Sequence, residues 1–213
     1  MHTNKSQYIK MSETVSIVSE KKVTYKTAPK YVSIEAYYKA EEKSLTKHEY
    51  HDGIVIPMAG AKLTHNRLAH KAAYLIEFFT EENHFDFIVS TGDTKIRIEE
   101  YNKIVYPDAV VICETPQYYN GREDTITNPL LVVEVLSLST ARFDRTTKFE
   151  YYRTLPSFKE YVLIHQDLRR VSVWTKQDDG AWLPKDYVGD EATAVLHSIQ
   201  NCPMPLARLY KGI

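Results

Sequence analysis

A single carboxylate interrupts the most apolar stretch of the sequence, Leu130-Leu-Val-Val-Glu-Val-Leu136. A run of this length with apolar side chains on both alternating faces is typical of a central β-strand that is covered on both sides. An uncompensated Glu134 in such a strand would cost several kcal/mol of folding free energy. The stretch therefore predicts a layered protein in which this strand lies in the middle of a buried sheet.

A second apolar stretch, residues 104–112, also carries one acid, Asp108. If these residues form one strand, the period of two places Asp108 on the same face as the apolar side chains two and four residues away. Two buried strands with one acid each indicate that a positive group lies between Asp108 and Glu134. The structural alternative for either acid is a position at a strand end, hydrogen-bonded or paired with an Arg.

The helix expected after these strands can supply the positive group. Ser139 or Thr140 can cap this helix, which ends before Pro156. At 100° per residue, Asp144 and Lys148 fall within its apolar arc rather than opposite that arc. An i,i+4 ion pair on the wet surface is the ordinary alternative. We expect Lys148 to reach toward the buried acids instead.

A histidine shows the same anomaly on an earlier helix, which Thr64 can cap and which runs to about Thr80. His65 lies in the middle of the apolar arc, in the first turn. A lone His on an apolar face can be a hydrogen-bonded core residue, and a His at the start of a helix can line a cleft. Both interpretations of His65 stay open from the sequence.

The remaining segments alternate between helix and strand signals. A helix is expected from Ser33 to about Glu42, with Ser33 as its N-cap. His51-Asp52-Gly53 predicts a hairpin turn, because Asp-Gly tolerates the positive φ of a tight turn. Strands are expected at residues 47–50, 54–58, 87–90, 94–98, 105–113, 130–136, 160–164, 171–174 and 182–188. This order predicts an α/β or α+β fold with a mixed sheet.

Charge divides the chain into two unequal parts. Residues 1–30 contain six Lys and two Glu, whereas the other 183 residues contain 21 basic and 26 acidic side chains. An acidic body argues against a protein that coats nucleic acid by bulk electrostatics, although an enzyme with one local, metal-neutralised cleft remains compatible with it. We predict a polar, flexible segment over residues 1–30 and one domain over residues 31–213.

The cysteine content and hydropathy indicate where such a chain works. Only Cys113 and Cys202 are present, which excludes a disulfide framework and favours a reducing cytoplasm. No window approaches the ~18 uninterrupted apolar residues of a membrane span, and residues 1–30 lack the apolar region of a secretory signal. We therefore expect a cytoplasmic protein without a membrane partner.

Two carboxylates on neighbouring strands offer the hard oxygen ligands that Mg²⁺ or Mn²⁺ prefers. A metal at Asp108 and Glu134 would activate a water and stabilise charge on a phosphoryl oxygen. A nearby Lys148 would help to deprotonate that water or stabilise the transition state. This combination of residue types is typical of a phosphodiesterase.

These residues resemble the PD-(D/E)XK nuclease superfamily, and most closely its bacterial Uma-type restriction-endonuclease-like family. The matching segments follow the family's order and span residues ~33–176: Glu49-Tyr-His-Asp-Gly53, a helix starting near His65, Pro107-Asp108, Val133-Glu-Val-Leu-Ser-Leu-Ser-Thr140, Asp144 with Lys148, Tyr151, and Glu160-Tyr161. The Lys that the superfamily has two residues after the acid is Leu136 here. The resemblance implies that its role has moved to Lys148.

The resemblance implies a restriction-endonuclease-like fold, a central mixed β-sheet flanked by helices, and a Mg²⁺-dependent DNA endonuclease. Asp108 and Glu134 would hold Mg²⁺, with Mn²⁺ as a substitute, and Lys148 would assist the attacking water. His65 would contact phosphate or water, and Glu49 would be either a further acidic ligand or a structural acid. Double-strand cleavage would be simplest with a two-fold homodimer.

Two other functions fit the same residues. The first is a catalytically weak or inactive DNA-binding protein that keeps the nuclease fold, which the acidic body and the displaced Lys allow. The second is a hydrolase that uses Asp108 and Glu134 as an acid/base pair, as glycosidases do. The second alternative predicts metal-independent activity and no role for Lys148.

Overall fold

The computed structural model describes residues 8–10, 13–15, 31–138 and 140–213. Most of the predicted flexible segment, residues 1–30, and the predicted cap Ser139 lie outside the described residues. Two short strands, β1 (Tyr8–Lys10) and β2 (Glu13–Val15), pair antiparallel within the N-terminal segment. None of the helices in the described part combines the length and apolarity that crossing a membrane requires.

The larger of two six-stranded sheets contains the apolar strand with Glu134 at its centre. Its strand order is β14-β13-β12-β11-β8-β5. The strands are β5 (Phe87–Thr91), β8 (Ala109–Cys113), β11 (Leu131–Leu136), β12 (Glu160–His165), β13 (Arg170–Lys176) and β14 (Trp182–Val188). β11 runs parallel to β12 and antiparallel to β8, so the sheet is mixed, as predicted.

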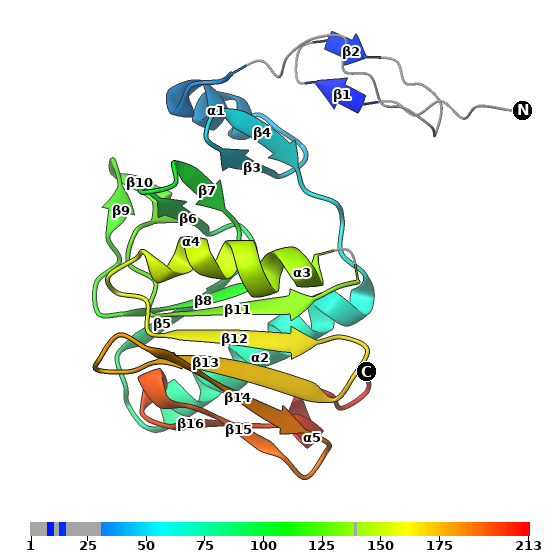
Figure 1. Cartoon of the computed structure of the whole chain (residues 1–213), viewed down its shortest axis with the longest axis vertical. Helices are drawn as coiled ribbons and strands as arrows, with labels where there is room; N and C mark the ends of the chain where they lie inside the picture. The colour runs from blue at the N-terminus through cyan, green and yellow to red at the C-terminus, as the bar shows by residue number, and fades with distance from the viewer. Residues whose placement is uncertain (1–7, 11–12, 16–30, 139) are drawn as a thin grey trace, which may run out of the picture.

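Helices cover both faces of this sheet, which explains why all six residues of β11 are buried. Leu131, Val133 and Val135 pack in the cluster that includes α2 (Leu63–Glu82). Val132 and Leu136 pack on the other face against α4 (Phe149–Arg153). Figure 1 shows the two helices on opposite sides of the strands. Because side chains alternate along a strand, Glu134 lies on the face that α4 covers.

The smaller sheet has the order β4-β3-β7-β6-β10-β9 and packs against α1 (Ile34–Glu41) through Tyr37 and Tyr50. Its strands are β3 (His48–His51), β4 (Ile54–Pro57), β6 (Lys95–Ile98), β7 (Lys103–Val105), β9 (Tyr118–Tyr119) and β10 (Arg122–Ile126). The predicted N-cap is confirmed, because the Ser33 hydroxyl accepts from the Ala36 amide. The predicted turn is confirmed too, since Asp52 and Gly53 have φ of 48° and 85°.

The expectation of one continuous strand over residues 105–113 was wrong. The chain leaves the smaller sheet after Val105 and enters the larger sheet at Ala109. Pro107 lies at the break, where it cannot donate to a strand ladder and restricts the residue before it. Asp108 therefore lies at the start of β8, at the junction between the sheets, rather than inside a strand.

Two helix predictions also need correction. α2 starts at Leu63, and its N-cap Lys62 makes no capping hydrogen bond through its side chain, so Thr64 is not the cap. The helix after residue 140 is not a regular α-helix: α3 (Ala141–Phe143) leads into a π-helical turn, η1 (Asp144–Lys148), and then into α4. A π-turn widens the helix locally and is frequent at functional sites.

The C-terminal segment completes the core around α2. It contains β15 (Thr193–Leu196), η2 (His197–Ile199), β16 (Cys202–Pro205) and α5 (Leu206–Leu209). Leu206, Leu209 and Tyr210 are buried in the same cluster as α2. α5 thereby lies beside α2 (Figure 1).

Candidate functional site

Two predicted acids lie side by side at the junction of the two sheets. The antiparallel register pairs Val133 of β11 with Ala109 of β8, so the next pair in that register is Glu134 and Asp108. Asp108 is tied to β11 directly, because its Oδ2 accepts a hydrogen bond of 2.7 Å from the Val135 amide. The prediction that Asp108 and Glu134 neighbour one another is confirmed.

Lys148 reaches Glu134 from the π-turn. Its Nζ lies 2.8 Å from Glu134 Oε1, 3.1 Å from the Tyr106 carbonyl oxygen and 3.7 Å from Glu49 Oε1. The side chains of Lys148 and Glu134 are 6% and 5% exposed, so this pair is shielded from solvent. The three protons of the ammonium group thus face three oxygen atoms. The expectation that Lys148 points inward rather than forming a surface ion pair is confirmed.

Glu49 enters the site from the smaller sheet. Its Oε1 accepts from the Tyr106 amide at 3.3 Å, and its Oε2 lies 2.9 Å from His51 Nε2. Burial raises the pKa of Glu49, but Lys148, His51 and the Tyr106 amide outweigh burial and lower it below its ordinary value. Glu49 is therefore a charged acceptor that links β3 to Lys148. His51 was missed from the sequence, although its i,i+2 spacing on a strand puts it on the same face as Glu49.

The site contains more carboxyl groups than ammonium groups. Burial raises the pKa of Glu134 well above its ordinary value; Lys148 opposes this shift, whereas Asp108 and Asp144 add to it. Asp144 is buried too, and burial raises its pKa despite Lys148 and a hydrogen bond from Thr140. Three carboxyl groups, those of Glu134, Glu49 and Asp144, thus act on the Lys148 charge, and Asp108 adds a fourth acid beside Glu134, an arrangement that favours an additional cation.

Lys148 stays protonated in these surroundings. Burial lowers the pKa of Lys148, but the carboxylates of Glu134, Glu49 and Asp144 outweigh burial and raise it well above its ordinary value. Glu134 also accepts from the Tyr152 hydroxyl at 3.0 Å. The positive group that the sequence predicted is therefore this lysine, which contacts Glu134 and Glu49; its described ion pairs do not include Asp108.

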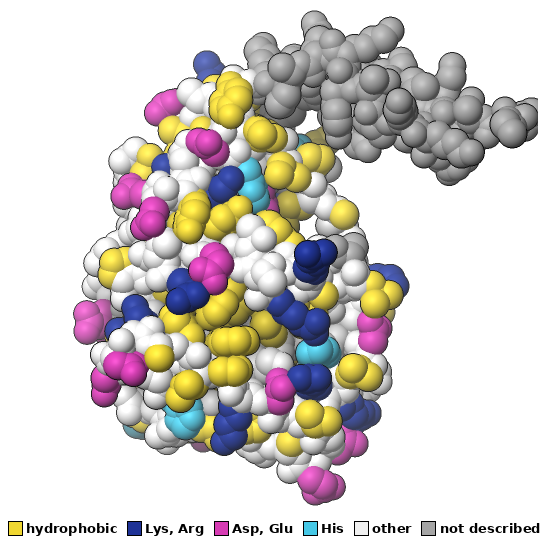
Figure 2. Space-filling model, in the orientation of Figure 1, with side chains coloured by type: hydrophobic (Ala, Val, Ile, Leu, Met, Phe, Trp, Pro, Cys, Tyr) yellow, Lys and Arg dark blue, Asp and Glu magenta, His cyan; other side chains and the backbone are white. Residues whose placement is uncertain are grey.

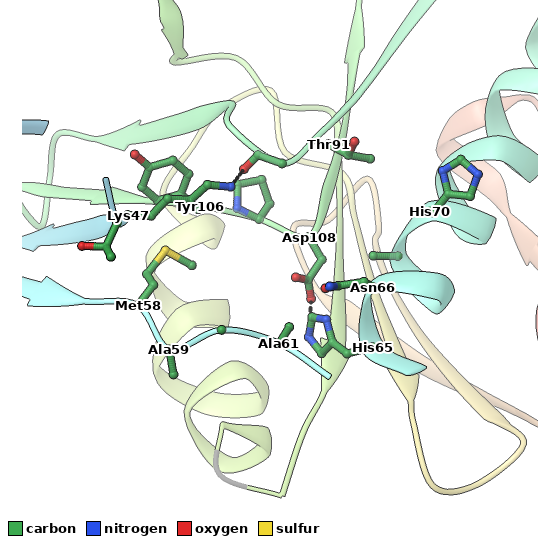
Figure 3. Close-up of a pocket in the computed structure, with 15 residues that line it drawn as sticks. Lys47, Met58, Ala59, Ala61, His65, Asn66, His70, Thr91, Tyr106 and Asp108 are labelled. Atoms are coloured by element: carbon green, nitrogen blue, oxygen red, sulfur yellow. Dashed lines mark hydrogen bonds and ion pairs between the residues drawn. The ribbon is translucent and has the colours of Figure 1, made fainter. Parts of the chain in front are cut away.

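His65, in the first turn of α2, contacts Asp108. Its Nε2 lies 3.3 Å from Asp108 Oδ2, and Figure 3 shows the imidazole and the carboxylate facing one another across the start of α2. Burial lowers the pKa of His65, but the hydrogen bond and charge of Asp108 outweigh it and raise the pKa. The sequence left His65 either in the core or at a cleft, and the structure places it at a cleft.

Two neighbouring cavities surround these side chains. One, of about 550 Å³, is lined by Glu49, Glu134 and Lys148, and the other, of about 460 Å³, by Lys47 and His70. They share His65, Asp108, Tyr106 and the linker residues 58–61, which Figure 3 shows passing beside the His65–Asp108 pair. His65 and Asp108 are thus accessible from both sides of this linker.

Gln166 lines the larger cavity and was not found from the sequence. It directly follows β12, beside the end of β11, and its amide oxygen is buried without a hydrogen-bond partner in the described structure. No periodicity or motif marks a single Gln after a strand. Nearby, Arg145 Nη2 lies 3.2 Å from His165 Nε2, and Figure 2 shows Lys and Arg side chains near α3 and the adjoining ends of β12 and β13.

The donor set of the site bears on whether it can hold a metal ion. In the part of the chain that the structure describes, no group of three or more His, Cys, Asp or Glu side chains is arranged to hold a metal. Mg²⁺, however, commonly binds through one or two carboxylates and keeps several waters. Asp108 and Glu134, which line one cavity with Glu49 and Asp144, fit this second kind of site.

Comparisons with known proteins show which family the chain belongs to. A family model described as "Uma2: Putative restriction endonuclease" matches residues 34–206. Two Synechocystis proteins are similar: "Uncharacterized protein sll1609" is 37% identical over 163 residues, covering 76% of this chain and 91% of that protein, and "Uncharacterized protein slr1290" is 34% identical over 158 residues, covering 73% and 80%.

A solved structure is similar as well. It is described as a putative nuclease belonging to DUF820 from Anabaena variabilis, and it aligns with a TM-score of 0.66 at 14% identity. The alignment covers 84% of this chain and 97% of that chain. At this identity the likeness shows the fold, and it confirms the predicted mixed sheet with flanking helices.

Proposed function

Because the chain belongs to the Uma2 restriction-endonuclease family, as its sequence resemblance predicted, we propose that it is a Mg²⁺-dependent endonuclease that hydrolyses phosphodiester bonds in DNA. One observation carries the proposal: the Lys148 ammonium lies 2.8 Å from the buried Glu134 carboxylate, beside Asp108, in a cavity of about 550 Å³. A buried pair of this kind is costly for stability, so a chemical role best explains its presence.

Asp108 and Glu134 are the residues that would hold Mg²⁺, and Mn²⁺ would substitute for it. A bound Mg²⁺ ion supplies a Lewis acid that lowers the pKa of a coordinated water and neutralises charge on a phosphoryl oxygen. The Val135 amide fixes the Asp108 carboxylate through Oδ2. The Tyr152 hydroxyl and Lys148 fix Glu134 through Oε1. Both carboxylates are therefore preoriented.

Lys148 would act through its charge. Its pKa is raised and three oxygen atoms surround its ammonium group, so it is a proton donor and not a base. An ammonium at this position can orient the attacking water and stabilise the charge that develops on the phosphoryl group. Glu49, held by His51, fixes the ammonium from the opposite sheet.

His65 would contact the phosphate or a water at the opposite side of Asp108. Its raised pKa favours the imidazolium form, which attracts an anionic phosphate. Since His65 lines both cavities, a DNA strand that occupied both would contact this side chain where it passes residues 58–61. The metal-independent acid/base alternative gives Lys148 no role, and the Lys148–Glu134 contact therefore supports it less.

Plasmid nicking tests the proposal. We expect the wild-type protein to nick supercoiled DNA with Mn²⁺ or Mg²⁺, and Asp108→Asn, Glu134→Gln and Lys148→Met each to reduce the rate at least 100-fold. The matched control is Glu150→Gln, which neutralises an exposed carboxylate on α4 that pairs only with Arg153 in the described structure. Nicking that persists in all three site variants would contradict the proposal.

The same assay separates the remaining alternative. A folded wild-type protein that binds DNA but does not nick it with either metal would favour the inactive, DNA-binding form of the fold. Nicking that survives removal of divalent metals by a chelator would favour the metal-independent hydrolase instead.

A further inference from the structure

Four cations gather on the outer surface of α2 and α5, next to the smaller cavity. Together with two exposed aromatic side chains they form a patch that we call the α2–α5 surface, made of Arg67, Lys71, Tyr74, Phe78, Arg208 and Lys211. Within the described residues, none of the four cations forms an ion pair with a carboxylate. Such a gathering is unexpected in a body that carries more acidic than basic residues.

The hydrogen bonds on this surface do not neutralise its charge. Arg67 Nη1 donates to the Gly212 carbonyl, and Lys71 Nζ donates to the carbonyls of Arg208 and Lys211. These bonds attach α2 to the C-terminal turn, but they bring the four cations together. The neighbouring charges of Arg67 and Lys211 help burial to lower the pKa of Lys71, as expected for cations that repel one another.

The first half of α2 carries basic side chains and no acid. Its first turn has no acid, and residues 63–76 contain no Asp or Glu, although His65, Arg67, His70 and Lys71 occur there. The helix dipole disfavours positive side chains only within the first turn, where His65 lies beside Asp108, so it does not act on Arg67 or Lys71. The first acid of α2 is the exposed Glu77, so the cations of the first half of the helix have no acid of their own helix within that half.

Exposed aromatic rings lie among the cations. Tyr74 is 48% and Phe78 40% exposed, their ring centroids are 6.0 Å apart, and the Arg208 guanidinium lies 5.8 Å from the Phe78 ring. Exposed aromatic rings between cations occur on surfaces that bind nucleic acid, where the rings can stack on unpaired bases while the cations contact the backbone. A purely apolar partner would leave the four cations without compensation.

The α2–α5 surface is continuous with the candidate site. Asn66 and His70 line the smaller cavity and begin the exposed face of α2. At 1.5 Å per residue, Lys71 lies about 9 Å beyond His65 along the helix axis. A phosphate repeat of 3.4 Å per strand makes this about two to three nucleotides.

We propose that the α2–α5 surface binds the backbone of the DNA two or more nucleotides from the phosphate at the His65–Asp108 pair. This inference rests on the proposed function, since it assigns a path to the same substrate. Arg208 and Lys211 contact phosphates, and the strand reaches the reactive groups through the smaller cavity.

The salt dependence of DNA binding tests this proposal. The affinity for a fluorescent duplex oligonucleotide is measured by anisotropy between 50 and 200 mM KCl with EDTA present, for the wild type and for Arg208→Gln/Lys211→Gln. Loss of two phosphate contacts reduces the magnitude of the negative slope of log K against log[salt] by about 1.8. The matched control is Lys39→Gln/Lys43→Gln, which removes two exposed charges at α1, far from α5 (Figure 1). An unchanged slope in the first variant, or an equal fall in the control, would overturn the proposal.

Two further readouts keep this proposal separate from the proposed function. Hydrolysis of bis(p-nitrophenyl) phosphate with Mn²⁺ should be equal in the wild type and the Arg208→Gln/Lys211→Gln variant, because that small substrate does not reach the α2–α5 surface. If the salt dependence falls in the variant but the wild type hydrolyses nothing, the nuclease proposal is refuted and the DNA-binding surface is supported. If the wild type hydrolyses the substrate but the salt dependence is the same in the variant, the nuclease proposal is supported and the DNA-binding surface is refuted. Loss of a dimer in the variant, with DNA binding unaltered, would show a protein interface and also overturn the proposal.

Discussion

Replacing Lys148 with Met should destabilise the protein in a way that depends on pH. The change keeps the length of the side chain but leaves the Glu134 carboxylate, 5% exposed, without its cation at 2.8 Å. Removing one partner of a buried pair costs about 3–5 kcal/mol. Glu134 can limit this cost by taking up a proton, since burial already raises its pKa. We therefore expect a loss of about 3 kcal/mol at pH 8.

The sign of the pH dependence follows from the pKa of Glu134, which burial raises and Lys148 holds down, so that Lys148→Met raises it further. A carboxyl whose pKa is higher in the folded state than in the unfolded state destabilises the fold above its unfolded pKa, near 4.5, and the penalty grows until the pH reaches the folded pKa. The stability lost by Lys148→Met should therefore be larger at pH 8 than at pH 5. The maximum slope is about 1.4 kcal/mol per pH unit.

Urea unfolding followed by tryptophan fluorescence measures this effect, since Trp174 and Trp182 pack against Phe149 of α4. The control is the double variant Lys148→Met/Glu134→Leu, which removes both charges and should recover most of the lost stability. A Lys148→Met variant that is as stable as the wild type at pH 8 would refute the reasoning. A double variant no more stable than the single one would also contradict it.

Three other predictions concern the surroundings of this pair. Glu49→Gln should remove stability that is present above about pH 4.5 and lost as the pH falls through the lowered pKa of Glu49, so urea unfolding of the variant should show a flatter dependence on pH between 5 and 3. Gln166→Leu should raise the free energy of unfolding by about 1 kcal/mol, because it removes a buried oxygen without a partner; an equal loss would mean that the oxygen is satisfied. Sedimentation in the presence of DNA should detect a two-fold dimer, and a monomer at all concentrations would contradict the predicted homodimer.

Local sequence signals identified most of the site. The single acid in an apolar strand predicted that Glu134 is buried, and the helical arc predicted that Lys148 points inward, because both arguments depend on the period of one element. The Asp52-Gly53 turn and the Ser33 cap were found from residue types at single positions. Each of these features is fixed by residues within a few positions of it.

Contacts between distant segments could not be found in this way. The link from Glu49 and His51 to Lys148 joins residues about a hundred positions apart, and only the packing of the smaller sheet against α3 and α4 brings them together. The break at Pro107 was visible as a proline, but no local signal said that β7 and β8 belong to different sheets. The π-turn likewise departs from the 3.6-residue period that predicted the helix.

Titration calorimetry with Mn²⁺ tests the central claim, a metal site made by Asp108 and Glu134, most directly. The account predicts that the wild-type protein binds Mn²⁺, that Asp108→Asn and Glu134→Gln weaken binding at least 10-fold, and that Glu150→Gln leaves it unchanged. Equal binding by all four folded proteins, or no binding by the folded wild type, would contradict the claim.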